Sequence, residues 1–280
     1  MNMKIRKAIT GLTVASAVAA AFAPFSAMAV LQRQGPIDPS NGFPAWYQDT
    51  TGVALEFCSP LNQGELDGGY CLLLPGDVLA VPEVFPGSFF DEHFFWASGA
   101  LMNSAGGAKA SLTLGVEAAF SVGPVIAGDQ VTFSRIRVLL NPVPVTGTYK
   151  FIHPYGHELL EGTQGERIFF TDDVGIGGRG NFTGATTSRL GPFLMASETP
   201  GGAELPAIDG PVAGKRYIAD PARSGPVTGS PLPPFMGNDG LMHDHNIFRI
   251  EGPVGSNLGG PGLDYIETSD FSLMGRLFTG

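Results

Sequence analysis

The sequence predicts an all-β protein with an antiparallel β-sandwich architecture, immunoglobulin-like or related, and three observations lead to this prediction. Residues 108–120 alternate between apolar and polar side chains, which is the period of a half-buried strand. The 40 glycines and 23 prolines are spread along the chain, where they interrupt any long helical pattern. Further apolar segments of strand length are separated by turn residues, as in consecutive antiparallel strands.

The first 29 residues have the pattern of a secretory signal peptide. An apolar stretch at residues 8–23 follows three basic residues, Lys4, Arg6 and Lys7. The segment ends on Ala27 and Ala29, the small residues that signal peptidase requires. We therefore predict cleavage after Ala29 and a location in the periplasm or outside the cell. No later apolar segment reaches the roughly 18 residues of a transmembrane helix.

Cys58 and Cys71 lie 13 positions apart and bracket a polar, glycine-rich loop. In an oxidising compartment an isolated pair of cysteines indicates a disulfide. A metal site is the alternative, but two thiolates without a nearby histidine are a poor ligand set. We therefore predict a bond between Cys58 and Cys71, which would stabilise the fold by about 3 kcal/mol in the chain-entropy model.

The clearest strands lie in the first half of the chain. Residues 89–102 are nearly all apolar or aromatic and are expected to form a buried strand. A hairpin loop at residues 103–107 leads into the alternating strand at 108–120. The even-numbered side chains of that strand are expected to face the core, with a bend at Gly115.

In the next apolar segment, residues 131–140, the alternating apolar side chains shift from odd-numbered to even-numbered positions. Val131 and Phe133 share one face, whereas the later apolar residues fall on the other. A β-bulge near Arg135 would explain this change.

A Pro- and Gly-rich turn at residues 142–147 precedes a strand at residues 148–153, in which Tyr149 is placed as in a tyrosine corner. Long Gly/Pro-rich loops at residues 174–184 and 221–240 are of the kind that often carries function. Short strands are expected at residues 168–170, 246–251 and 271–278. The mature chain is long enough for one large β domain or for two β-sandwich units, at residues 30–160 and 161–280.

The charge of the mature chain restricts its partners. Removal of the signal peptide leaves 13 of the 16 basic residues against all 26 acidic residues, a net charge of −13 with histidine neutral. An acidic surface repels nucleic acid and anionic membranes and keeps an exported protein soluble. We therefore expect an extracellular or envelope ligand and no nucleic acid.

Histidines are the candidates for metal chemistry. His243 and His245 are two residues apart and would project from the same side of a strand, as two metal ligands can. His153 and His157 would join them if the fold brings the two segments together. The spacing alone is a weak motif, and the segment has the composition of an exposed loop. We therefore predict that His243 and His245 are not essential ligands, and we expect no cofactor.

Carboxylates are the candidates for hydrolysis. A glycosidase holds two carboxylates across a cleft. The adjacent pairs at residues 91–92 and 172–173 would point to opposite faces of a strand, so each pair is expected to be solvated edge charges. The sequence contains neither a nucleophile-elbow motif nor a phosphate-binding loop. We therefore assign no catalytic residue.

Several segments resemble a group of secreted bacterial β-rich proteins with no assigned activity. These segments are residues 43–50 continuing to Cys58, 128–137, 153–156, 246–253 and 271–276. The resemblance implies secretion and β structure, and it carries over no catalytic residue.

Two functions follow as expectations. The first is a secreted, non-catalytic β-sandwich protein with a binding or structural role in the cell envelope or outside the cell. The alternative is a secreted metal-dependent or carboxylate hydrolase, whose cluster would be His153, His157, His243 and His245.

Overall fold

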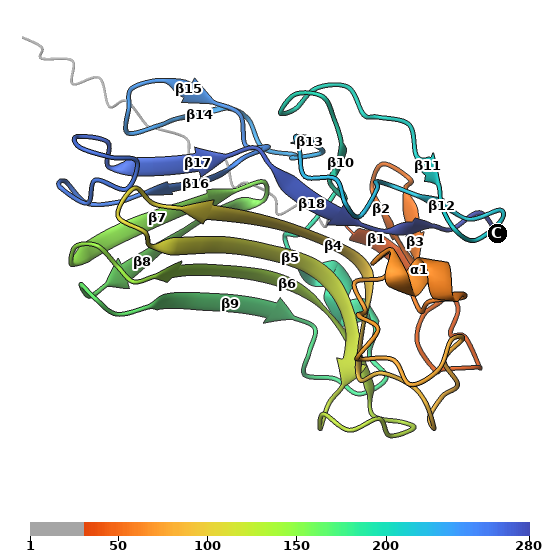
Figure 1. The fold of residues 1–280 in the computed structure, drawn as a ribbon. Helices are drawn as coiled ribbons and strands as arrows, with labels where there is room; N and C mark the ends of the chain where they lie inside the picture. Colours follow the sequence, from red (N-terminus) through yellow and green to blue (C-terminus); the bar gives the residue numbers. More distant parts are fainter. Residues whose placement is uncertain (1–30) are drawn as a thin grey trace, which may run out of the picture.

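The computed structural model describes residues 31–280, so the predicted signal peptide and its cleavage site lie outside the described residues. Within this part, nearly all regular structure is β, and the strands pair in antiparallel fashion (Figure 1). The helical elements are α1 (Gln63–Asp67) and the short 3-10 helix η1 (Thr183–Thr187). No helix in residues 31–280 is both long enough and apolar enough to cross a membrane.

A five-stranded sheet forms the centre of the molecule (Figure 1). Its strands, in spatial order, are β18 (Phe271–Met274), β4 (Glu92–Asn103), β5 (Lys109–Phe120), β6 (Gln130–Asn141) and β9 (Ile168–Val174).

Two further sheets and two short hairpins complete the fold. The four-stranded sheet has the order β17 (Tyr265–Thr268), β16 (Phe248–Glu251), β7 (Gly147–His153) and β8 (Gly156–Gly162). The six-stranded sheet has the order β1 (Leu31–Gln34), β2 (Trp46–Asp49), β3 (Ala54–Glu56), β19 (Arg276–Leu277), β12 (Arg216–Tyr217) and β11 (Ile208–Asp209). The hairpins pair β10 (Met195–Ala196) with β13 (Val227–Thr228), and β14 (Phe235–Met236) with β15 (Met242–His243).

The hydrophobic core lies against the inner face of the five-stranded sheet. The even-numbered side chains of β5 are at most 5% exposed, as the alternation predicted. One continuous cluster joins them to Phe151 and Ile250 of the four-stranded sheet and to Tyr47 and Leu55 of the six-stranded sheet. The prediction of an all-β, sandwich-like fold is therefore confirmed. Each of the three larger sheets contains strands from both sides of residue 160.

The predicted bulge near Arg135 is wrong. β6 keeps a regular register with β5 along its length, and the bulge lies instead in β4, between Phe94 and Trp96. The apolar residues shift from odd to even positions because the first part of β6 is buried on both faces. Phe133 lies on the outer face, where the Arg135 guanidinium covers its ring at 4.8 Å and leaves it 2% exposed.

The predicted strand at residues 271–278 is two strands in different sheets. β18 pairs with β4 in the five-stranded sheet, and β19 pairs with β3 in the six-stranded sheet. Gly275 lies between them, where a Cβ would meet Leu55 at 2.9 Å and Ile218 at 3.0 Å. The chain therefore crosses between sheets at a residue that has no room for a side chain.

Tyr149 forms the hydrogen bonds of a tyrosine corner, as predicted. Its hydroxyl donates to the Val145 carbonyl at 2.7 Å and accepts from the Val145 amide at 3.2 Å. These bonds fix the turn before β7.

The predicted disulfide between Cys58 and Cys71 is present. It packs on the outer face of the five-stranded sheet, against Ala97 and Met274. The bond therefore closes the loop that contains α1, and the two cysteines pack this loop against the sheet face.

Replacing both cysteines with serine is expected to lower the melting temperature. The loss of about 3 kcal/mol corresponds to about 6–12 °C in a domain of this size. Differential scanning calorimetry of the oxidised parent and the double variant measures this shift. A shift below 2 °C would contradict the expected stabilisation.

Candidate functional site

The outer face of the five-stranded sheet carries a row of small and polar side chains. Cross-strand pairing places five residues side by side, one from each strand: Ser272, Gly99, Thr113, Arg137 and Thr171. Neighbouring strands are 4.7–4.9 Å apart, so the row is about 19 Å long. No side chain stands on the sheet at Gly99, which leaves a low floor in this part of the row.

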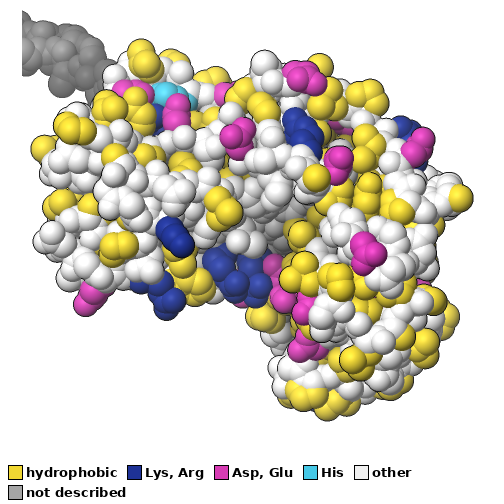
Figure 2. Space-filling view, viewed as in Figure 1, with side chains coloured by type: hydrophobic (Ala, Val, Ile, Leu, Met, Phe, Trp, Pro, Cys, Tyr) yellow, Lys and Arg dark blue, Asp and Glu magenta, His cyan; other side chains and the backbone are white. Residues whose placement is uncertain are grey.

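Two adjoining cavities, with volumes of about 380 and 490 Å³, lie over the part of this row formed by β18, β4 and β5. Both are lined by Gly99, Thr113 and Ser272, so they form one continuous depression, which we call the sheet groove. Figure 2 shows the hollow on this face beside the apolar lobe at the right. A groove with a small-residue floor can accept a chain that lies across the strands.

The disulfide-linked segment supplies the apolar wall of the sheet groove. Leu72 and Leu74 line it and are 46% and 63% exposed, and Pro221 lines it from the opposite segment. Leu72 has a φ of 59°, in the left-handed region that a bulky residue seldom adopts. Because Leu72 directly follows the bonded Cys71, the disulfide helps to hold this conformation at the edge of the groove.

A charged cluster lies beside the groove on the same face. Arg135 donates to Glu117 at 2.7 Å and to Asp173 at 2.8 and 3.0 Å, and it lies 3.5 Å from Glu92. Glu117 is 1% exposed, and burial, together with the neighbouring carboxylates, raises its pKa to about 8 despite Arg135. The expectation of solvated edge charges is therefore wrong for Asp173, which is bound by Arg135.

The pKa of Glu117 predicts a pH-dependent stability. A carboxyl with a folded-state pKa of about 8, against an ordinary value of 4.5, holds its proton more tightly when folded. Its contribution is therefore complete below pH 4.5 and is lost as the pH rises through 8. Urea unfolding from pH 5 to 8.5 should show a steeper decline in the parent than in Glu117→Gln. Equal slopes in the two proteins would contradict this assignment.

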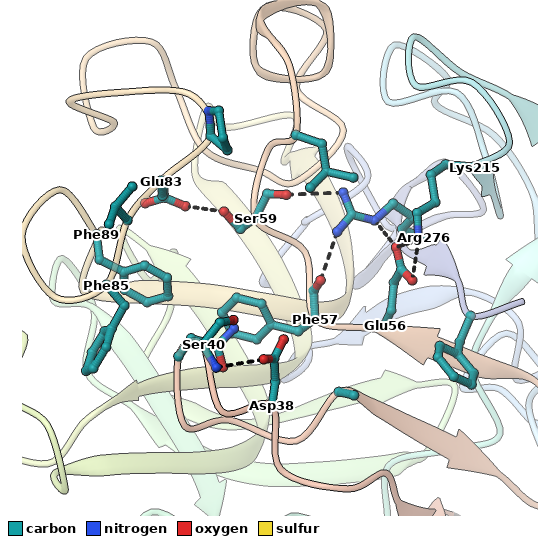
Figure 3. Close-up of a pocket in the computed structure, with 16 residues that line it drawn as sticks. Asp38, Ser40, Glu56, Phe57, Ser59, Glu83, Phe85, Phe89, Lys215 and Arg276 are labelled. Carbon is teal, nitrogen blue, oxygen red and sulfur yellow. Dashed lines mark hydrogen bonds and ion pairs between the residues drawn. The ribbon is translucent and has the colours of Figure 1, made fainter. Parts of the chain in front are cut away.

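A second cavity, of about 420 Å³, lies between the six-stranded sheet and the segment before β4 (Figure 3). Aromatic rings cover much of its wall: Phe57, Phe85, Phe89 and Phe278. Glu56 lies on the opposite side and is bound by Arg276 and Lys215. We call this cavity the aromatic pocket.

The buried carboxylates of the aromatic pocket are already bound by the protein. Glu83 accepts from the Ser59 hydroxyl at 2.6 Å and the Phe90 amide at 2.7 Å, and it pairs with His93 at 2.7 Å. These contacts lower the pKa of Glu83 against the opposing effect of burial, which is the larger single influence. Carboxylates held in this way stabilise the fold and leave little free hydrogen-bonding capacity for a ligand.

The four candidate histidines do not form one metal cluster. His153 is fully buried and its pKa is lowered to about 4 by burial, which keeps it neutral, whereas His157 is exposed. Within residues 31–280, one group of three His, Cys, Asp or Glu residues has ligand atoms within 4.8 Å of one another, namely Cys58, Glu65 and Cys71. Its two sulfurs are bonded to each other.

His243 and His245 do not lie in an exposed loop, contrary to the sequence prediction. His243 pairs with Asp239 at 2.9 Å and lies 3.4 Å from Glu267. His245 is buried, and its Nδ1 lies 2.7 Å from the Pro233 carbonyl oxygen. The two residues are ordered by contacts within the protein.

The acidic partners of His243 belong to a cluster around Arg249, whose side chain is fully buried. Arg249 pairs with Glu251 at 2.9 Å, Glu267 at 2.7 Å and Asp239 at 3.3 Å. Its guanidinium also lies 3.8 Å from the centre of the Tyr265 ring. These contacts tie the β14–β15 hairpin to β16 and β17.

No protein-family model, curated protein or solved structure matches this chain. The resemblance to secreted bacterial proteins therefore stays a prediction from sequence segments.

The sheet groove was not found from the sequence. Its floor residues, such as Gly99 and Thr113, belong to no catalytic motif, so the sequence does not mark them as a site. A signal is present in the alternation of β5, because Ser111 and Thr113 were expected to face away from the core.

Proposed function

We propose that this is an exported, non-catalytic binding protein whose sheet groove holds an extended polysaccharide chain. The observation that carries the proposal is the continuity of the groove over β18, β4 and β5 on the outer face, with two cavities sharing Gly99, Thr113 and Ser272. A polymer lying in this groove would contact three neighbouring strands of one hydrogen-bonded sheet. Binding sites on regular elements are more precisely held than sites on loops.

The chemistry of the groove favours a polysaccharide over a peptide. Ser111, Thr113 and Ser272 offer hydroxyls that can both donate to and accept from sugar hydroxyls. Leu72 and Leu74 provide an apolar wall for the C–H faces of sugar rings. An extended peptide usually adds to a free sheet edge, whereas this groove lies on a sheet face.

The location is part of the same proposal. The signal-peptide pattern at residues 1–29 supports export, and the disulfide suits an oxidising compartment. The periplasm and the extracellular space both satisfy these conditions.

We place binding ahead of hydrolysis. Glu117 has the raised pKa of a general acid and lies on the groove face, where Asp173 is held ionised by Arg135. However, the Glu117 side chain is 1% exposed, so a chain in the groove would not reach it. Incubation with a bound polysaccharide is therefore expected to release no reducing ends.

Blocking the groove tests the proposal. Affinity electrophoresis is run with hydroxyethyl cellulose and with carboxymethyl cellulose, which share one backbone. For each polymer that retards the parent protein, Thr113→Trp should weaken the binding by about tenfold, because the indole would stand on the groove floor. Thr148→Trp is the matched control, since Thr148 is an exposed strand residue outside the groove, and its binding should stay within twofold of the parent.

Two results would contradict the proposal. One is that neither polymer retards the parent protein. The other is that Thr113→Trp binds as the parent does while its melting temperature shows that it is folded.

A further inference from the structure

Cations with no carboxylate partner among residues 31–280 lie on the outer face of the five-stranded sheet, beside the sheet groove. Among the 13 Lys and Arg residues in the described part of the chain, seven have a carboxylate within 4.0 Å. Of the six that have none there, three lie on this one face: Lys109, Arg137 and Arg167. Figure 2 shows Lys and Arg side chains over β5, β6 and β9 with hydrophobic atoms between them. On an acidic protein these three cations are a local concentration of positive charge.

Phe169 organises two of these cations. The Arg137 guanidinium lies over its ring at 5.4 Å and the Arg167 guanidinium at 5.2 Å, and the ring is 46% exposed. A guanidinium that rests on an aromatic face keeps its N–H edge available. That edge matches the two oxygens of a carboxylate in a bidentate contact.

The cations adjoin the floor of the groove. Arg137 pairs across the strands with Thr113, which lines both cavities, and Lys109 and Ser111 lie on the same face of β5. A chain lying in the groove and continuing toward β9 would therefore meet Arg137 and then Phe169.

The acidic groups on this face do not cancel the cations. Asp173 lies near enough to Arg137 for Arg137 to contribute to the lowering of its pKa, but both its oxygens are already bound by Arg135. Asp270 is an exposed carboxylate that lines the groove on its β18 side, away from Arg137 and Phe169. Acidic groups farther away are largely screened beyond about 10 Å at 0.1 M salt. Direct contacts with Lys109, Arg137 and Arg167 therefore determine the local preference.

We infer that the polysaccharide held by the sheet groove is acidic, and that Arg137 and Arg167 bind its sugar carboxylates. This inference rests on the proposed function and adds the substrate class. The two guanidiniums flank one exposed aromatic ring, so a uronic acid residue could place its carboxylate on an arginine while its ring contacts Phe169.

The two cellulose derivatives test the inference because they differ in charge on the same backbone. The parent should bind carboxymethyl cellulose at least about tenfold more tightly than hydroxyethyl cellulose at 0.1 M salt. The double variant Arg137→Gln/Arg167→Gln should reduce this preference to about twofold. Arg216→Gln is the matched control, since Arg216 is an exposed strand arginine in the six-stranded sheet, and it should keep the full preference.

Arg167→Gln alone, at an exposed position, provides the same test if the double variant does not fold. Equal binding of the two polymers by the parent would overturn the inference, as would a double variant that keeps the preference. If hydroxyethyl cellulose binds and Thr113→Trp blocks it without any effect of charge, the acidic class is wrong and the proposed function stands. If neither polymer binds, both fail.

Discussion

Replacing Arg276 with leucine is expected to lower the free energy of unfolding by about 3–5 kcal/mol, the range for breaking a buried ion pair from one side. Arg276 is 3% exposed and binds two carboxylates, Glu56 and Glu65. It also donates to the carbonyl oxygens of Phe57 at 3.0 Å and Ser59 at 3.1 Å. The variant would remove all of these contacts at once.

The cost arises mainly at Glu65. Its side chain is fully buried, and without Arg276 it would keep only the Tyr217 hydroxyl at 2.7 Å and the Leu61 amide at 2.7 Å as partners. A buried carboxylate with no cation is strongly unfavourable. Adding Glu65→Gln to the leucine variant should therefore recover part of the lost stability.

Arg216→Leu provides the matched control. Arg216 lies on the neighbouring strand β12, where it faces Asp209 at 3.8 Å with both side chains exposed and also donates to the Ala207 carbonyl. Such surface changes usually cost about 0.5 kcal/mol or less. Urea unfolding followed by tryptophan fluorescence measures all three variants. A loss below 1 kcal/mol for Arg276→Leu would refute a stabilising role for the buried cluster.

Leu114→Asp is expected to be comparably damaging, with a cost of several kcal/mol. Leu114 is 0% exposed and lies at the middle of β5 on the inner face, within the continuous core. Aspartate would place two charged carboxylate oxygens in this core where the leucine methyl groups were, without a hydrogen-bond partner or a cation.

The adjacent residue separates the effect of burial from that of strand position. Thr113→Asp introduces the same residue one position earlier, on the groove face. Its free energy of unfolding should stay within about 1 kcal/mol of that of the parent. Chemical denaturation of the two variants gives the comparison. Similar losses in the two variants would be inconsistent with the assignment of the inner and outer faces of β5.

The parts of the fold that could be predicted are those governed by neighbouring residues. The burial of β5 follows from a period of two, because successive side chains on a strand point to opposite faces. The tyrosine corner at Tyr149 involves a backbone group four residues away. The disulfide follows from two cysteines 13 residues apart and from the oxidising compartment that the signal-peptide pattern predicts.

The parts that could not be predicted depend on distant contacts. Phe133 lies on the outer face of β6 and is nevertheless buried, because Arg135 covers it, so the hydrophobic pattern alone indicated a bulge that is absent. Asp173 was expected to be solvated because adjacent residues on a strand point to opposite faces, so that it and Asp172 could not act as a pair. Its cation, Arg135, is 38 residues away and is brought to it only by the pairing of β6 with β9.

The sequence by itself determined the long central strands, the side of β5 that faces the core, the cysteine pair and the acidic character of the chain. Each of these depends on residue type and short-range spacing. Only the tertiary structure decided which charges are paired, as Glu56 and Arg276 are 220 residues apart and meet inside the protein. It also decided the site, because Ser272, Gly99 and Arg137 become neighbours only when β18, β4, β5 and β6 align in one sheet. Hydrogen bonding between strands sets that register, and it joins residues that no local pattern connects.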